Sequence, residues 1–193
     1  MKTFQQIPVW LVIAALLTAL TIIGHEIAHY LGALAMGASD VALHWADVTF
    51  DAATLSGWGL AFTWFAGPLF THAIILVVLL SRASGIVALA LGLGACSRDL
   101  VVLPFTIKLL LGRDVSTFTN DEVTAAAALG IAPHAFAVFA AGLGLVGLAV
   151  FLNRAYRSKG ALFAVTLILG TLAGIALWSV IGPTLLPGGK GVG

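Results

Sequence analysis

Three ionisable residues stand close together in an otherwise apolar stretch near the N-terminus: His25, Glu26 and His29. Residues four apart lie one turn apart on the same face of a helix, so both imidazoles can reach one metal ion. Glu26 is rotated from His25 by about a third of a turn, so it can face metal-bound water without being a ligand. This is the HExxH arrangement of two zinc ligands and a general base.

The apolar setting of this motif makes an accidental occurrence costly. An ionisable side chain at membrane depth costs on the order of a few kcal/mol unless it is paired or functional. The run from Tyr30 to Met36 continues the apolar stretch, which indicates that the motif still lies inside the membrane span. The alternative is a helix end that emerges at the interface, where the three side chains would be solvated.

A zinc site of this kind needs a third protein ligand and an open position for water. The only glutamates are Glu26 and Glu122, so few residues are available for a zinc site in which a glutamate on a helix is the third ligand. Asp99 lies near the middle of the third expected span, which runs parallel to the first, so residues at mid-depth can meet. A structural role is the alternative for Asp99. Asp121 is the reserve ligand, provided that its loop folds back into the site.

Further residues in the second and third expected spans are candidates for contact with a substrate or for support of the metal ligands. Gly67 and Pro68 should weaken the second helix and free backbone groups for a neighbouring side chain or substrate. Thr71 and His72 follow one turn later; a lone histidine such as His72 is either a hydrogen-bonded core residue or a support for the site. Arg98 either contacts a substrate carbonyl or extends toward the interface.

The elements that must position these residues are membrane helices. The chain has 193 residues, of which 61% are hydrophobic and 9% charged, whereas a soluble domain carries roughly a quarter charged residues. Apolar stretches near the ~20 residues needed to cross a bilayer predict an all-α polytopic membrane protein. The five expected spans are 8–36, 57–80, 85–111, 131–152 and 160–182.

The connections between these spans differ in character. In residues 39–55, apolar and polar residues alternate around Asp47, which predicts a short strand or hairpin at the membrane edge near 40–51; an interfacial loop anchored by Trp45 is the alternative. Residues 112–130 read as a polar connection. The excess of lysine and arginine at the N-terminal side of the membrane favours a cytoplasmic N-terminus.

Composition also excludes some classes of function. No basic stripe with stacking aromatic residues is present, so nucleic acid is not an expected partner. The lone Cys96 excludes an intramolecular disulfide framework and a cysteine-rich metal site.

The chain resembles the site-2 protease family of intramembrane zinc metalloproteases, especially its small bacterial members. The resemblance covers about residues 8–111 and rests on three features in order: His25-Glu-Ile-Ala-His29 in one span, Ala66-Gly-Pro-Leu69 in the next, and Asp99 in the third. It implies one zinc ion held by the two histidines and Asp99, with Glu26 activating water. The region 39–55 would then be edge β-structure that guides the substrate by strand addition.

The same resemblance implies that residues 1–193 form a single membrane-embedded metalloprotease domain, with core helices at 8–111 and additional helices at 131–182. The substrate would be a transmembrane segment of another protein, and the setting a bacterial or archaeal cell membrane. Regulation would come from a membrane partner or a second copy of the chain. The chain departs from the family pattern at Thr71, where asparagine is usual, and around Asp99, which stands between Arg98 and Leu100.

Other functions of the same residues stay open at this stage. A non-enzymatic protein could bind or transport a divalent metal through the histidines and would not need Glu26 as a base. An inactive relative of the protease could act as a binding partner. A haem protein is disfavoured because His25 and His29, one turn apart on one helix, cannot bind opposite faces of a haem.

Overall fold

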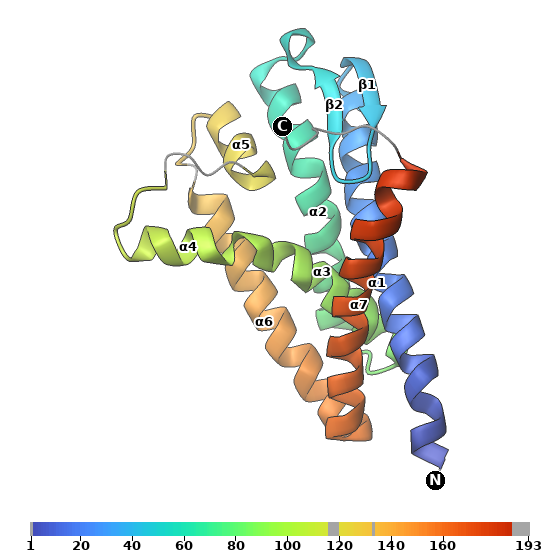
Figure 1. The fold of residues 1–193 in the computed structure, drawn as a ribbon. Coiled ribbons are helices and arrows are strands. Elements are labelled where there is room, and N and C mark those ends of the chain that lie inside the picture. The colour runs from blue at the N-terminus through green and yellow to red at the C-terminus, as the bar shows by residue number, and fades with distance from the viewer. Residues whose placement is uncertain (1, 116–119, 133, 187–193) are drawn as a thin grey trace.

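The computed structural model describes residues 2–115, 120–132 and 134–186. Within them, five helical segments are long and apolar enough to cross a membrane, which confirms the predicted number of spans. These segments are α1 (Lys2–Ala35), α2 (Gly57–Ser81), α3 (Ile86–Asp99) with its continuation α4 (Leu103–Leu110), α6 (His134–Lys159) and α7 (Ala161–Leu185). The fold is that of an all-α multi-pass membrane protein with one small sheet (Figure 1).

Large apolar side chains cover much of the outer surface of this bundle. Leu80 on α2 is 80% exposed and Val180 on α7 is 74% exposed. In water such a surface would drive aggregation, whereas in a bilayer lipid chains solvate it.

The apolar core fills the half of the bundle that lies toward the N-terminus. Trp10 of α1, Ile75 of α2 and Phe163 of α7 belong to one buried cluster there. The buried histidines and carboxylates lie outside this cluster, and a second, smaller apolar cluster contains Val102, Phe105 and Ala137.

The third span is not one continuous helix. It tightens into a 3-10 turn at Leu100–Val102 and resumes as α4, which runs crosswise to the long helices in Figure 1. Pro104 explains the change, because it has no N–H to offer the carbonyl of Leu100 four residues earlier. The N–H of Leu103 bonds that carbonyl instead, as in a 3-10 turn. Pro68, in contrast, lies inside an uninterrupted α2.

The alternating segment after α1 forms a hairpin, so the strand prediction is confirmed over the loop alternative. Strand β1 (Ser39–Leu43) pairs antiparallel with β2 (Val48–Asp51), with Ala42 opposite Thr49. The turn is fixed from outside, since the indole nitrogen of Trp178 on α7 donates to the carbonyl oxygen of Trp45 at 2.8 Å. The hairpin is thus held between the end of α1 and the end of α7.

The expected polar connection at 112–130 contains a helix that was not predicted, α5 (Asp121–Ala128). The Asn120 side chain caps it by accepting a hydrogen bond from the N–H of Val123 at 2.9 Å, and Asp121 and Glu122 occupy its first turn, where acidic residues are favourable. Helix α5 packs beside α2 and α6 (Figure 1).

Small residues allow the long helices to approach closely, as the glycine-rich spans predict. A Cβ on Gly170 of α7 would lie 2.5 Å from the Cβ of Ala14 on α1. A Cβ on Gly32 of α1 would lie 2.9 Å from the Cβ of Ala66 on α2. This second contact brings α1 and α2 together beside the two histidines.

Candidate metal centre

Helix α1 places His25 and His29 on one buried face, one turn apart. The side chains are 1% and 4% exposed, and their Nε2 atoms lie 3.1 Å apart. The ring planes meet at 76°, with centroids 4.8 Å apart. Each ring thus directs its Nε2 atom toward a common point, as the HExxH spacing predicts.

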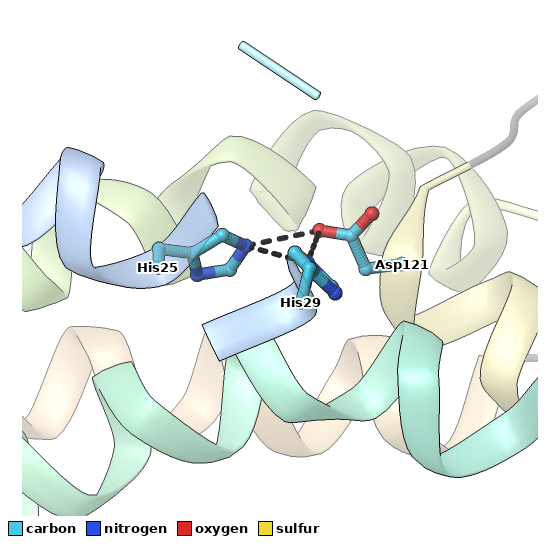
Figure 2. A group of neighbouring side chains, drawn as sticks. All are labelled: His25, His29 and Asp121. Atoms are coloured by element: carbon cyan, nitrogen blue, oxygen red, sulfur yellow. Dashed lines mark hydrogen bonds and ion pairs between the residues drawn. The ribbon is translucent and has the colours of Figure 1, made fainter. Parts of the chain in front are cut away.

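Asp121, at the start of α5, supplies the third atom of the group. Its Oδ2 lies 3.1 Å from Nε2 of His25 and 3.2 Å from Nε2 of His29 (Figure 2). Together with the 3.1 Å between the two nitrogens, these distances form a nearly equilateral triangle. Neighbouring ligand atoms around tetrahedral zinc lie roughly 3.3 Å apart when the bonds are about 2.0 Å long. The triangle therefore fits one face of such a site. We call His25, His29 and Asp121 the metal-site group.

Protons alone do not satisfy the contacts within the metal-site group. Each imidazole nitrogen can carry one proton directed at one partner, so two nitrogens satisfy at most two of the three contacts. Nδ1 of His29 lies 2.7 Å from the carbonyl oxygen of Thr63, which places the proton of a neutral His29 on Nδ1 and the lone pair on Nε2. A single cation bound to all three atoms would satisfy every contact.

Gly67 of α2 backs the metal-site group from the second span. A Cβ on this residue would lie 2.6 Å from Nε2 of His25 and closer still to Nε2 of His29. Any side chain here would occupy the space that the ring nitrogens face. The glycine of the Ala66-Gly-Pro-Leu69 segment thus has a physical reason: a residue without a side chain lets the two imidazoles lie between α1 and α2. The neighbouring Pro68 is buried as well.

The structure does not bring Asp99 to the histidines. Its carboxylate is 1% exposed, accepts a hydrogen bond from Oγ1 of Thr71 at 3.1 Å, and lies 3.3 Å from Nε2 of His72. The expected set of His25, His29 and Asp99 is therefore replaced by one in which the reserve residue Asp121 is the third member. We call Thr71, His72 and Asp99 the Asp99 group.

Helix geometry explains this exchange. Adjacent residues on a helix point about 100° apart. Arg98 faces the metal-site group, where its Nη2 donates to Oδ2 of Asp121 at 2.6 Å. Asp99 consequently points to a different side of α3, toward α2 and α6: it accepts from Thr71 of α2, and a Cβ on Gly144 of α6 would lie 3.0 Å from the Cβ of Asp99.

The two acidic residues of α5, Asp121 and Glu122, have different electrostatic environments, which shift their pKa values in opposite directions. Burial by itself would raise the pKa of the Asp121 carboxyl, but the ring nitrogens of His25 and His29 and the charge of Arg98 outweigh burial and hold this pKa well below its ordinary value. Burial dominates at Glu122 and raises its pKa, although the charge of Arg98 acts in the opposite direction. Asp121 is thus a carboxylate, the form that can ligate a metal.

Glu26 borders two adjoining cavities beside the metal-site group. The outer cavity, of about 240 Å³, is lined by residues of α1, α3, α7 and the hairpin turn, among them Arg98, Trp45 and Trp178. The inner cavity, of about 40 Å³, is lined by Glu26, His29 and Asp121 together with hairpin residues. Both cavities are bordered by Glu26 and Arg98, and neither is lined by Asp99 or His72.

Sequence reasoning thus located part of the site. The structure brings together His25, His29, Glu26, Gly67 and Arg98, and sets Thr71, His72 and Asp99 apart as a second buried group.

Sequence reasoning underrated Asp121. A local signal for its helix exists, since Asn120-Asp121-Glu122 followed by four alanines at 125–128 is a typical helix start before strong helix formers. No such local signal states that α5 docks against α2 and α6.

No family model, curated protein or solved structure matches the chain.

Proposed function

We propose that this protein is an intramembrane zinc metalloprotease that hydrolyses a peptide bond in or near a transmembrane segment of another membrane protein. The convergence of His25 Nε2, His29 Nε2 and Asp121 Oδ2 within 3.1–3.2 Å of one another, inside a membrane helix bundle, carries the proposal. Two imidazoles and one carboxylate are a common ligand set for a hydrolytic zinc ion that keeps one position open for water.

Each residue of the HExxH motif then has a separate role. A bound zinc ion would supply an acidified water and polarise the scissile carbonyl. Glu26 is not part of the ligand triangle, yet it borders the cavities that adjoin it. Its carboxylate can accept the proton of an attacking water and return it to the leaving amine.

The hairpin offers a way to hold the substrate in the extended form that hydrolysis requires. Among the described residues each of its two strands pairs only with the other, so each keeps one edge that is not paired with another strand. Residues 46–48 and Phe50 of the hairpin line the inner cavity together with Glu26 and His29. An unwound peptide added to an edge of the hairpin by backbone hydrogen bonding would pass close to these groups.

The surroundings of the site fit a membrane substrate. The metal-site group lies in a bundle whose outer surface is apolar, so the natural neighbours of the cavities are lipid and other membrane segments. A bacterial or archaeal cell membrane is the setting that the sequence resemblance implies. A membrane partner or a second copy of the chain would supply regulation.

The first test is the metal content of detergent-purified protein, measured by inductively coupled plasma mass spectrometry after zinc is supplied and excess removed. Near-stoichiometric zinc is expected in the wild type and in Glu26→Gln, which keeps all three ligands. Little zinc is expected in His25→Ala and Asp121→Ala. A wild type without bound zinc would sink the proposal.

The second test is proteolysis. Membranes are incubated with reconstituted wild type or Glu26→Gln, and newly formed peptide N-termini are labelled and identified by mass spectrometry. Cleavage products are expected with the wild type only, because Glu26→Gln removes the base. Glu122→Gln, the same chemical change at the other glutamate, is the matched control and should cleave normally. Zinc binding without products that depend on Glu26 would identify a non-enzymatic metal protein instead.

A further inference from the structure

Arg98 shares the oxygen of Asp121 that faces the two histidines. Its Nη2 lies 2.6 Å from Asp121 Oδ2, the same atom that lies 3.1 Å from His25 Nε2 and 3.2 Å from His29 Nε2. The two side chains are only 20% and 15% exposed, so solvent screens their attraction weakly.

The carboxylate needs such a partner because of the element that carries it. Asp121 is the first residue of α5, a helix of eight residues, and a helix this short is not stable on its own. The buried side chains of Ala125 and Ala126 pack α5 against its neighbours, but they do not fix the direction of the Asp121 side chain. Arg98 reaches the carboxylate from α3.

A carboxylate oxygen can satisfy both neighbours at once. It has two lone pairs, so Oδ2 can bind a metal with one and accept a hydrogen bond from Arg98 with the other. Carboxylates that ligate metals are usually hydrogen-bonded in this way, and the partner fixes their orientation. The guanidinium itself is always protonated and has no lone pair to offer, so it cannot be a ligand.

We infer that Arg98 is a positioning residue of the metal site: it contributes no ligand atom but holds the Asp121 carboxylate of α5 against His25 and His29 of α1. This inference rests on the proposed zinc site and deepens it, because it explains how a ligand from a short helix outside the spans joins two ligands inside one. The site is thus completed by a contact from α3.

The planar guanidinium matters in this role as well as the charge. Arginine presents rigid donors that match a carboxylate, whereas lysine carries a single strongly hydrated ammonium group at the end of a flexible chain. Arg98→Lys keeps the charge and one donor, so it should restore part of what Arg98→Ala removes.

The test is the zinc affinity of the full-length protein in detergent, measured by competition with a chromophoric chelator. Arg98→Ala should weaken zinc binding by about 10- to 100-fold, the usual cost of losing a partner that orients a ligand, and Arg98→Lys should fall between it and the wild type. Arg113→Ala is the matched control, since Arg113 is exposed and should bind zinc like the wild type.

A double-mutant comparison separates positioning from a general loss of structure. If Arg98 acts through Asp121, adding Arg98→Ala to Asp121→Ala should not weaken zinc binding further. An additive loss would overturn the inference, as would unchanged or tighter binding by Arg98→Ala; tighter binding would mean that the guanidinium competes with the ion. Absence of zinc from the wild type would instead refute the proposed metal site itself.

Discussion

Two groups of histidine and aspartate side chains lie in the same helix bundle, and the geometry of their contacts differs. In the metal-site group, three ligand atoms converge within 3.1–3.2 Å, and His29 and Asp121 reach a cavity that also holds Glu26. In the Asp99 group, one carboxylate meets one imidazole at 3.3 Å and one hydroxyl at 3.1 Å. The first group has more lone pairs than protons can satisfy, whereas in the second Oδ1 of Asp99 accepts one hydrogen bond and Oδ2 faces one imidazole nitrogen without a hydrogen bond.

The two groups also differ in their surroundings: the metal-site group borders a cavity, whereas aromatic rings pack against the Asp99 group. His72 is packed against the rings of Phe65 and Phe139, with centroids 6.0 and 5.5 Å away, and Gly144 closes on Asp99 from α6. Buried polar side chains that face one another across two helices, with aromatic rings around them, contribute to packing between those helices. The comparison teaches that residue type and depth do not by themselves distinguish a candidate metal ligand; the number of converging lone pairs and access to a cavity do.

The strongest test of this comparison replaces each aspartate in turn. Asp121→Ala removes one of three ligands and should weaken zinc binding by more than the ~100-fold that loss of an outer partner costs. Asp99→Ala should retain zinc at nearly the wild-type affinity, because Asp99 is not in the triangle. Chelator competition on both variants measures the effect. Loss of zinc in Asp99→Ala alone would exchange the roles of the two groups.

The second prediction concerns the glycine behind the metal-site group. Gly67→Ala places a methyl group 2.6 Å from Nε2 of His25, so the rings must turn away and zinc binding should weaken by about 10- to 100-fold, as for other losses of ligand orientation. Gly142→Ala on α6 is the matched control, because a Cβ there meets nothing within 4 Å. Equal zinc affinity in both variants would show that Gly67 does not shape the site.

The third prediction extends the comparison to stability. In zinc-free protein, Asp99→Ala leaves His72 buried without the carboxylate it faces and should lower the free energy of unfolding by about 1–3 kcal/mol. Asp121→Ala should cost at least as much, because it leaves the guanidinium of Arg98 without its carboxylate. Unfolding in detergent, followed by circular dichroism with a chelator present, compares each variant with the wild type. An unchanged free energy of unfolding in Asp99→Ala would contradict a structural role for the Asp99 group.

The sequence predicted the metal-site group only in part, for a geometric reason. Spacing within one helix determines the relation of His25, Glu26 and His29, so these positions could be predicted. The rotation of α3 could not, because a membrane helix that is apolar on all sides gives no periodic signal for the face it turns inward. The depth of Asp99 in the third span suggested it as a metal ligand. The rotation of α3 instead turns the neighbouring Arg98 toward the metal-site group.

The position of Asp121 depends on docking between elements far apart in the chain. Its helix has a recognisable start, but the polar composition of 112–130 favoured a loop, and the contact of α5 with α2 is set by tertiary packing. The hairpin could be predicted because a period of two is a local property of the sequence. Local patterns thus predicted the elements, and the missing part was the way in which they meet.

The smallest expected effect concerns the residue that follows Asp121. Burial raises the pKa of Glu122, so the folded protein binds its proton more tightly than the unfolded chain, and stability falls as pH rises above the ordinary glutamate pKa of about 4.3. Glu122→Gln removes this dependence and still offers Asn120 an oxygen in place of Oε2, which accepts from its Nδ2 at 2.5 Å. The difference in free energy of unfolding between variant and wild type should therefore grow, by less than about 1 kcal/mol, from mildly acidic to neutral pH. Histidine titration affects both proteins alike, so parallel curves would mean that Glu122 is not disfavoured as a carboxylate.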